Sequence, residues 1–358
     1  MTDHVNLLLI GFGSVARSFV NLLIQRATRL GLQWHIVGVA TARHDCAMAP
    51  AGINCATLLR LADEGMSLAA CHDASTGSVP ANTMELLKRV AKWQQGHPEA
   101  ARLTMVENTP LSLNGGQPGL DHVRAALELG ADVITANKGP AAFAYRELLK
   151  QASASGSTFR FEGAVLDGLP VFSLLRETLP GAHVERVRGV VNTTTNHLLT
   201  AMEQGRSIDD AVADMQAAGI AEADPAMDVD GWDAAAKTAV LANVLLGAEI
   251  TPHDVVREGL RALEPSAVQA ARQAGGVIKL VASAERRRND IVATVGPRVL
   301  DGCDPLAGLS GTAKGLVIET DVLGPLVITK QASDVTHTAY ALMADLLSIH
   351  RQTNNPPT

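Results

Sequence analysis

Apolar runs alternate with helical periodicity along the first 150 residues. Val5–Ile10 is an apolar run followed by a glycine-rich turn, a helical pattern through Phe19–Ile24 and a second apolar run over His35–Ala40. Short runs of this kind are typical of buried parallel strands. Further strands are predicted at 103–106 and 132–135, and further helices at 120–129 and 141–152. This order of strands and helices predicts an α/β fold with a parallel sheet.

The small-residue segment Ser153–Ser157 is a candidate domain boundary. Beyond it, alternation predicts strands at Thr158–Val165, which carries Glu162, and at Val184–Val191. The spacing predicts helices over 171–178, 198–203, 208–218 and 251–263, and a final helix over 334–349. A β-rich segment lies between the last two of these helices, with strands expected at 278–282, 291–295, 315–318 and 326–329. We therefore expect one domain over 1–152, a second over 153–330, and a flexible tail over 351–358.

Composition and charge narrow the class of protein. The 358 residues are 47% hydrophobic and 19% charged, which suits a soluble two-domain enzyme. The net charge of −7 argues against nucleic acid or an anionic membrane as the main partner. The four cysteines show no CxxC spacing, and no apolar stretch approaches the length of a membrane span. The N-terminus lacks a basic region and its apolar run is broken by Gly11 and Gly13, so it is not expected to be a signal peptide. We expect a cytoplasmic protein that acts on a small molecule.

The glycine-rich turn reads Gly11-Phe12-Gly13-Ser14-Val15-Ala16 and stands between a predicted strand and a predicted helix. In that setting a G-x-G-x-x-A pattern predicts a dinucleotide site, since glycines admit the pyrophosphate and the helix N-terminus supplies N–H groups. The alternative is a tight turn without a ligand. Thr109 and Lys138 follow other predicted strands, so they belong to the same edge of the sheet as Gly11.

The end of the second predicted strand bears on the choice of nucleotide. An Asp or Glu at this point would bind the ribose 2′-hydroxyl of NAD. The chain instead reads Ala40-Thr41-Ala42-Arg43-His44, with the first carboxylate at Asp45. Arg43 favours NADP through its 2′-phosphate, with NAD as the alternative if Arg43 is a plain surface residue.

An acidic stretch, Gly219–Lys237, leads into an almost wholly apolar segment. It carries Glu222, Asp224, Asp228, Asp230 and Asp233. The spacing does not fit an EF-hand. Asp230 is placed to cap the following helix, with Asp233 in its first turn. Lys237 lies four residues after Asp233 on the same face as Val240, Leu241 and Val244. It is predicted either to form an i,i+4 pair with Asp233 or to be a buried lysine in a polar site. A buried lysine beside a carboxylate can act as a proton donor.

Ordered motifs over roughly residues 5–350 resemble the homoserine dehydrogenase family. They are Gly11–Val15, Thr135–Pro140, Glu162–Val165, Asp167–Pro170, Gly189–Asn196 and the acidic stretch through Lys237. The chain departs from the usual family pattern at Ala16, at Thr193 and at Leu166-Asp167. A late glycine-rich motif near the final helix is also absent.

The resemblance implies a Rossmann-type nucleotide-binding domain and an α+β catalytic and dimerisation domain. It implies reversible hydride transfer between NADPH, or NADH, and L-aspartate 4-semialdehyde, giving L-homoserine. Lys138 and Lys237 are then the candidate catalytic residues. Candidate contacts to the substrate are Glu222, Asp228, Asp233 and Thr194. Candidate contacts to the cofactor are Gly11, Gly13, Ser14, Val15, Arg43, Thr109, Asn137 and Lys138.

The resemblance also implies a Na⁺ or K⁺ ion held by the Glu162 carboxylate and backbone oxygens, including that of Val165. It implies a homodimer formed through the second domain and a C-terminal helix, within 331–350, packed on the first. The chain matches the short form of the family, without a regulatory or kinase domain. Two other hypotheses remain open at this point: a related dehydrogenase for another small amino or hydroxy aldehyde, and a nucleotide-binding protein without catalysis.

Overall fold

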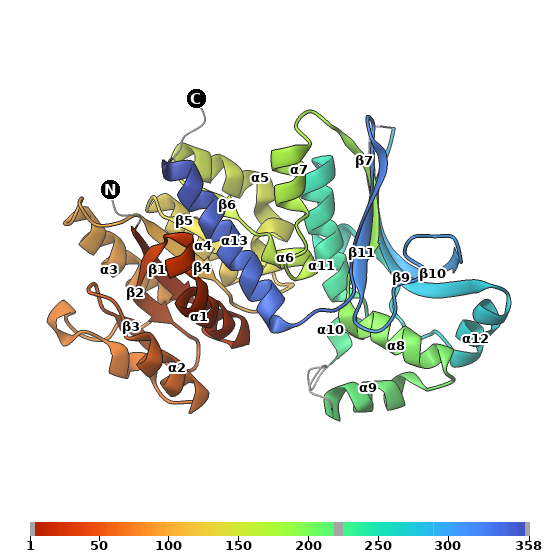
Figure 1. Cartoon of the computed structure of the whole chain (residues 1–358), viewed down its shortest axis with the longest axis horizontal. Helices are drawn as coiled ribbons and strands as arrows, with labels where there is room; N and C mark the ends of the chain where they lie inside the picture. The colour runs from red at the N-terminus through yellow and green to blue at the C-terminus, as the bar shows by residue number, and fades with distance from the viewer. Residues whose placement is uncertain (1–3, 218–224, 289, 355–358) are drawn as a thin grey trace. The chain divides into compact units, whose positions relative to one another are not determined.

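The computed structural model describes residues 4–217, 225–288 and 290–354 (Figure 1). The chain divides into two compact units, one of which ends at Gly168 and resumes at Asp334, while the other is Leu169–Ser333. The first unit extends beyond the small-residue segment 153–157 because the next strand, β6 (Phe159–Arg160), pairs with β5 (Asp132–Thr135).

The first unit is built on a six-stranded sheet in the order β3-β2-β1-β4-β5-β6. Only β3 is antiparallel to its neighbour. The remaining strands are β1 (His4–Ile10), β2 (Gln33–Ala40), β3 (Cys46–Met48) and β4 (Leu103–Glu107). The helices are α1 (Ser14–Arg26), α2 (Cys55–Asp63), α3 (Thr83–Gln95), α4 (Gly119–Glu128), α5 (Lys138–Ala154), α6 (Gly163–Leu166) and α13 (Val335–Asn354), with 3-10 turns at Thr28–Leu30, Leu68–Cys71 and Ala74–Thr76. The predicted α/β class with a parallel sheet is confirmed.

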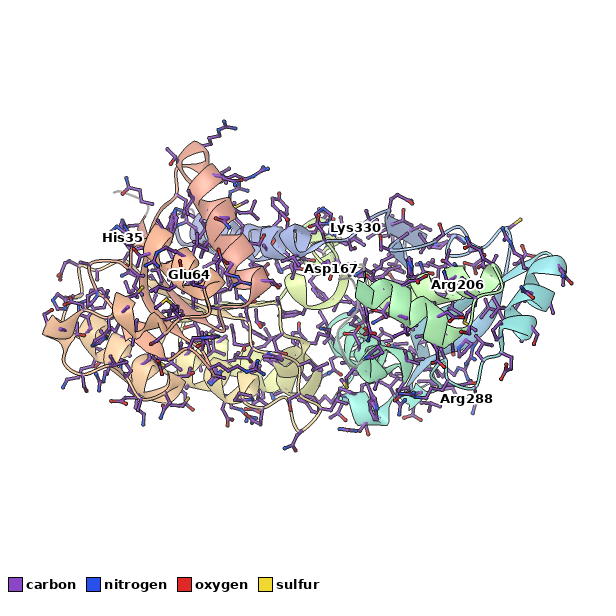
Figure 2. The ribbon with its side chains drawn as sticks, turned by 90° about the horizontal axis from the view of Figure 1, so that it is seen from below. His35, Glu64, Asp167, Arg206, Arg288 and Lys330 are labelled. Carbon is purple, nitrogen blue, oxygen red and sulfur yellow. The ribbon has the colours of Figure 1, made fainter. Side chains whose placement is uncertain are left out.

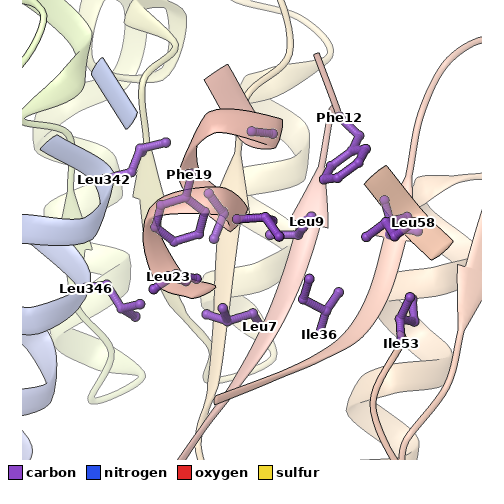
Figure 3. Close-up of a cluster of buried hydrophobic side chains, with 14 of the residues drawn as sticks. Leu7, Leu9, Phe12, Phe19, Leu23, Ile36, Ile53, Leu58, Leu342 and Leu346 are labelled. Atoms are coloured by element: carbon purple, nitrogen blue, oxygen red, sulfur yellow. The ribbon is translucent and has the colours of Figure 1, made fainter. Parts of the chain in front are cut away.

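One face of this sheet buries a large apolar cluster. Leu7 and Leu9 of β1 pack with Phe19 and Leu23 of α1, and Figure 3 shows Leu342 and Leu346 of α13 against the same helix. The C-terminal helix therefore lies beside α1 and completes the core of the first unit (Figure 1). Burying a leucine or phenylalanine side chain stabilises a fold by about 1.5–3 kcal/mol, so α13 is an integral part of this unit.

The register of the sheet brings four strand ends into one row. Ile10 of β1 pairs with Ala40 of β2 and with Glu107 of β4, and Glu107 pairs with Thr135 of β5. The residues that follow these positions therefore meet at one edge of the sheet. In parallel sheets that edge is where ligands bind.

The second unit contains a mostly antiparallel sheet in the order β12-β11-β7-β9-β10-β8. Its strands are β7 (Val184–Val190), β8 (Val256–Arg257), β9 (Gly276–Arg287), β10 (Asp290–Asp301), β11 (Lys314–Thr320) and β12 (Gly324–Lys330). Its helices are α7 (Phe172–Thr178), α8 (Thr193–Glu203), α9 (Ile208–Ala217), α10 (Ala226–Val229), α11 (Trp232–Leu241) and α12 (Pro265–Gln273), with a π-helical turn at Ala242–Leu246 and a 3-10 turn at Pro252–Asp254.

The strand predicted over Thr158–Val165 is wrong after Arg160. The Glu162 backbone N–H donates to Asp345 Oδ2 at 2.8 Å, so the chain leaves the sheet and turns into α6. Asp167 ends that short helix with φ of 47°, and it is labelled in Figure 2 with Arg288, another non-glycine residue of positive φ.

The helix predicted over Thr251–Leu263 is also wrong. Thr251 and Asp254 cap a single 3-10 turn that begins with Pro252, and the chain then enters β8. Gly259 follows in a tight packing position, since a Cβ there would lie 2.6 Å from Val229 O. A continuous helix is incompatible with that approach of two backbones.

Asp230 does not cap α11, contrary to the sequence prediction. Gly231, with φ of 78°, occupies the cap position, and Asp230 ends the preceding helix α10. The Asp230 carboxylate instead forms an ion pair with Arg261. No helix in the described ranges is long and apolar enough to cross a membrane.

Candidate active site

The glycine turn after β1 has the geometry that a pyrophosphate requires. Gly11 has φ of 82°, and a Cβ there would lie 2.7 Å from Asn108 O, so only glycine fits. Gly13 precedes α1, and a Cβ at Gly13 would meet nothing within 4 Å. No side chain caps the first turn of α1, where Ser14 and Val15 lie. Open space beside uncapped N–H groups fits the pyrophosphate of a dinucleotide.

Arg43 is exposed in the turn that joins β2 to β3. The turn is held by Thr41 Oγ1, which accepts the His44 backbone N–H at 2.8 Å. The Asp45 carboxylate accepts a hydrogen bond from the Ser67 hydroxyl at 2.5 Å. The Asp45 carboxylate, the first after β2, is therefore engaged by Ser67. The Arg43 guanidinium stays exposed at the carboxyl end of β2.

Glu107 organises the ends of β4 and β5, a role that the sequence analysis missed. Its side chain is fully buried, and burial raises the pKa of its carboxyl. Its Oε1 accepts the Thr109 backbone N–H at 2.8 Å and the Thr109 hydroxyl, and its Oε2 accepts the Thr135 hydroxyl at 2.8 Å. The carboxyl group thereby fixes Thr109, one of the predicted cofactor contacts.

Asn137 connects this network to α5. Its Nδ2 lies 3.3 Å from Thr109 Oγ1, and its Oδ1 accepts the Gly139 backbone N–H at 2.9 Å, which caps the helix. Lys138 is the first residue of α5 and is half-buried. A Cβ at Gly119 would lie 2.4 Å from Asn137 Nδ2, so the surrounding chain locks the position of this amide.

Glu162 and Val165, the predicted cation ligands, lie one helical turn apart around α6. Both are buried, Glu162 to 5% exposure. No group of three or more His, Cys, Asp or Glu side chains suited to a metal occurs among residues 4–217, 225–288 and 290–354.

In the second unit, Asn192 joins two of the predicted substrate residues. It caps α8 by accepting the Thr195 backbone N–H at 2.8 Å. Its Nδ2 donates to Asp228 Oδ1 and to Asp233 Oδ2, both at 2.7 Å. In the sequence, Asn192 belongs to the motif Gly189–Asn196 and has no predicted role of its own. Its position at a predicted strand-to-helix turn is the feature that could have indicated one.

Lys237 is the buried lysine of this cluster. It is 6% exposed, and its Nζ lies 2.7 Å from Asp233 Oδ2 and 2.8 Å from Val191 O. The i,i+4 pair of Asp233 and Lys237 is therefore present, and it is buried. Because Val191 and Asn192 directly follow β7, the strand fixes the lysine and its carboxylate partner together.

Two predicted substrate residues remain, Thr194 and Glu222, and the structure describes the first of them. Thr194 is buried in the first turn of α8, 7% exposed. Glu222 lies outside the described residues.

A cavity of about 750 Å³ lies at the opposite edge of the first sheet from the glycine turn. It is lined at the amino ends of β1, β4 and β5 by His4, Asn6, Thr104 and Asp132, and by His35, which is labelled in Figure 2. Because cofactors bind beyond the carboxyl ends of parallel strands, we do not assign the dinucleotide to it.

Comparison with known proteins agrees with these features. A family profile described as homoserine dehydrogenase matches residues 170–347. A protein from Pseudomonas canavaninivorans named NAD(+)-dependent homoserine dehydrogenase is 34% identical over 356 residues, which cover 98% of this chain and 97% of the relative. The crystal structure of homoserine dehydrogenase from Thermoplasma acidophilum has a TM-score of 0.79 and 26% identity, covering 97% of this chain and 99% of that one.

A solved structure of a hyperthermophilic archaeal homoserine dehydrogenase mutant in complex with NADPH has a TM-score of 0.78 and 26% identity, covering 99% of each chain. The first unit has the Rossmann-type topology with its glycine turn, and the second has the lysine–carboxylate cluster. The near full-length match to a relative above 30% identity decides the assignment, and the chain belongs to the homoserine dehydrogenase family.

Proposed function

We propose that the protein catalyses the NAD(P)-dependent interconversion of L-homoserine and L-aspartate 4-semialdehyde, a step of threonine, methionine and isoleucine biosynthesis. The observation that carries the proposal is the buried Lys237, held between Asp233 and Val191 O directly after β7. Oxidation of an alcohol requires a group that removes the hydroxyl proton, and reduction of the aldehyde requires the same group to return it. The nicotinamide, when bound, exchanges the hydride.

Lys237 is the proposed proton-transfer residue. Two hydrogen-bond acceptors, Asp233 Oδ2 and Val191 O, hold its Nζ within 2.8 Å of each, so the amino group is oriented before substrate arrives. As the neutral amine it takes the hydroxyl proton of the alcohol, and as the ammonium it returns that proton to the aldehyde oxygen. Pre-oriented charge stabilises a developing alkoxide more strongly in a buried site than in water. Lys138, at the first turn of α5 in the first unit, is the other proposed catalytic lysine.

The carboxylates of the second unit are proposed to bind the substrate. Asp228 and Asp233 share Asn192 as a donor, and their negative charges suit an amino-acid ammonium group. Thr194 and Glu222 complete the proposed set. We accordingly propose the second unit as the substrate-binding part and the first as the dinucleotide-binding part.

Substitution of Lys237 tests the proposal. Lys237→Ala is expected to lower kcat for homoserine oxidation by about 10²–10⁴-fold, the usual contribution of a positioned proton-transfer group. The Kd for NADPH should stay at the wild-type value. Lys150→Ala, an exposed lysine of α5, is the matched control. Unchanged turnover in Lys237→Ala would remove the lysine from the mechanism.

NADP is the proposed preferred cofactor, with NAD as the alternative. Arg43 at the end of β2 supports a contact to the 2′-phosphate, whereas the Pseudomonas canavaninivorans relative is named as NAD(+)-dependent. Arg43→Ala should raise the KM for NADPH more than the KM for NADH. Arg29→Ala, an exposed arginine just beyond the far end of α1, should change neither. Equal effects of Arg43→Ala on both cofactors would argue against the phosphate contact.

We further propose a homodimer and a monovalent cation. The hairpin of β11 and β12 exposes apolar side chains at an edge of its sheet, with Val322 at 70%, Leu323 at 53% and Val327 at 47% exposure. Light scattering should give twice the chain mass for the wild type and one chain mass for Val327→Lys. A wild-type monomer would contradict the dimer.

Glu162 with the Val165 carbonyl is the proposed site for Na⁺ or K⁺. Activity should therefore rise when K⁺ or Na⁺ replaces a bulky organic cation at equal ionic strength, and Glu162→Gln should lose that response. A wild-type rate that is the same in all three salts would contradict the ion.

A further inference from the structure

The cavity at the amino ends of β1, β4 and β5 has no role in the proposed reaction, and it lies within the first unit. Its volume of about 750 Å³ is within the range of small-molecule sites, roughly 300–1,000 Å³. Its lining includes the buried Val5 of β1, the buried Leu346 and Ile349 of α13, and the half-buried Trp93 of α3. These side chains offer an apolar and partly aromatic surface to a flat organic molecule.

Arg102, in the segment between α3 and β4, supplies a fixed cation to the lining. Its Nε lies 2.6 Å from Asp132 Oδ2, and its Nη2 donates to Asp132 Oδ1 at 3.0 Å and to Gly156 O at 2.6 Å. None of these contacts uses Nη1, and the Arg102 side chain is 40% exposed. The guanidinium is therefore held in place while part of it stays open to a ligand.

The two carboxylates of the lining present little negative charge to the cavity. The Asp132 side chain is 2% exposed, and its Oδ1 also accepts the Thr158 backbone N–H at 2.7 Å, so it is engaged by the protein itself. Glu99 is exposed, and water screens its charge. A ligand in the cavity thus meets the guanidinium of Arg102 rather than a carboxylate.

Three imidazoles line the same space: His4 of β1, His35 of β2 and His350 of α13. His4 Nε2 lies 2.9 Å from His35 Nδ1, and the two rings meet edge to face. This hydrogen bond needs one neutral ring as the acceptor, and two protonated rings at this distance repel each other. Partial burial and the neighbouring His4 accordingly lower the pKa of His35. An anion in the cavity would offset that repulsion.

We propose that this cavity is a second ligand site, which binds a small aromatic carboxylate. The carboxylate pairs with Arg102 and the imidazoles, and the ring packs on Trp93 and the apolar side chains of α13. The glycine turn lies at the opposite edge of the sheet, at the carboxyl ends of the strands, so this ligand and the dinucleotide can bind together. The site does not depend on the proposed dehydrogenase activity.

Calorimetric titration of the full chain with three small probes of similar shape tests the class of ligand. The probes are benzoate, the neutral benzamide and the cationic benzylamine. Benzoate should bind at one site per chain, and the other two should bind at least roughly tenfold more weakly, since hydrogen bonds between charged groups are the stronger kind. The Kd for benzoate should be the same with and without saturating NADPH.

Two substitutions locate the site. Arg102→Met should raise the Kd for benzoate roughly tenfold and leave the Kd for benzamide unchanged. Because that change leaves the buried Asp132 without its cation, His35→Gln, at an exposed ring, is the second variant. Lys92→Met, at an exposed lysine of α3 outside the lining, is the matched control and should bind benzoate like the wild type.

The pH dependence of benzoate binding tests the role of the imidazoles. The titratable and charged side chains of the lining are His4, His35, Glu99, Arg102, Asp132 and His350. A carboxylate stays ionised between about pH 6 and about pH 8, whereas imidazoles gain protons as pH falls through that range. The Kd for benzoate should therefore decrease from pH 8 to pH 6, and the decrease should be smaller in His35→Gln.

Four results would overturn the proposal: no binding of benzoate, equal affinity for benzoate and benzamide, displacement of benzoate by NADPH, or wild-type benzoate binding in both Arg102→Met and His35→Gln. Absence of homoserine oxidation in protein that binds benzoate as expected would refute the proposed function and leave this site intact.

Discussion

Asn192→Ser separates the two roles that Asn192 plays in the second unit. Serine retains the helix cap, because its hydroxyl can accept the Thr195 backbone N–H. It lacks the amide N–H groups that reach Asp228 Oδ1 and Asp233 Oδ2, both at 2.7 Å. The substitution therefore removes the bridge between the two carboxylates and leaves α8 intact.

The expected magnitude follows from the type of bond. A hydrogen bond to a charged group contributes about 1.5–3 kcal/mol. The Asp233 side chain is 15% exposed, so water replaces the lost donor poorly, and this carboxylate also holds Lys237. If that free energy is lost from the transition state, kcat/KM falls by about 10- to 150-fold, since 1.36 kcal/mol corresponds to tenfold.

Steady-state kinetics with homoserine, together with thermal unfolding, measures both roles. Asn192→Ser should lose kcat/KM and keep most of its stability. Asn192→Ala should lose a further ~1 kcal/mol of stability through the missing cap. A serine variant with wild-type kcat/KM would refute the proposal that Asn192 positions Asp233 and Lys237.

Three further predictions concern the turn and the buried charges. Gly11→Ala should destabilise the protein, because its Cβ would meet Asn108 O at 2.7 Å, whereas Gly13→Ala should keep its Tm and only weaken cofactor binding; equal Tm losses would contradict this. In the folded protein, burial raises the pKa of the Glu107 carboxyl above 4.5. The preference of the fold for the protonated carboxyl therefore stabilises the protein fully below pH 4.5, and this stabilisation is lost as pH rises through the folded pKa. The Tm of Glu107→Gln relative to wild type should rise from pH 5 to pH 8, and a constant difference would refute the shift. Burial lowers the pKa of Lys279 below 10.5, so the Tm of the wild type should rise as pH increases toward 10.5, and Lys279→Met should abolish that rise. A wild-type Tm that does not rise toward pH 10.5 would argue against the lowered pKa.

Local patterns in the sequence predicted the first unit because its strands are apolar runs and its helices are periodic. β1, the glycine turn and α1 follow one another without interruption, so periodicity alone fixed their type. The second unit was less predictable. The segment after Thr251 has helical periodicity, but the approach of Gly259 to Val229 O is a tertiary contact that no local pattern encodes.

In the candidate site too, contacts between residues close in sequence were predictable and contacts between distant residues were not. Lys237 and Asp233 were found because they stand four residues apart on one helix face. Asn192 lies 41 residues before Asp233 in the sequence, and their contact depends on the packing of α8 with α10, the helix that precedes α11. Glu107 and Asn108 stand together at a strand end, and the sequence does not distinguish them. The structure shows that the Glu107 carboxyl accepts several hydrogen bonds, whereas the Asn108 amide has no partner among the described residues.

Asp230 illustrates a competition between two capping residues. Its type and position suited an N-cap, but Gly231 adopts the left-handed conformation and displaces the helix start by one residue. The carboxylate of Asp230 then finds Arg261, which lies 31 residues later. From sequence alone, Asp230 and Gly231 can be ranked as caps only by residue propensity. The ion pair of Asp230 with Arg261 is a tertiary contact that favours Gly231 as the cap.

Initial-rate measurements on the purified protein test the central claim most directly, with L-homoserine as substrate and NAD or NADP as acceptor. Reduced nicotinamide should form with L-homoserine and at least one of the two acceptors, and Lys237→Ala should remove most of that rate. Turnover of other small amino or hydroxy alcohols in preference to homoserine would contradict the proposed substrate. No reduction of either cofactor by wild-type protein would contradict the assignment of catalysis itself.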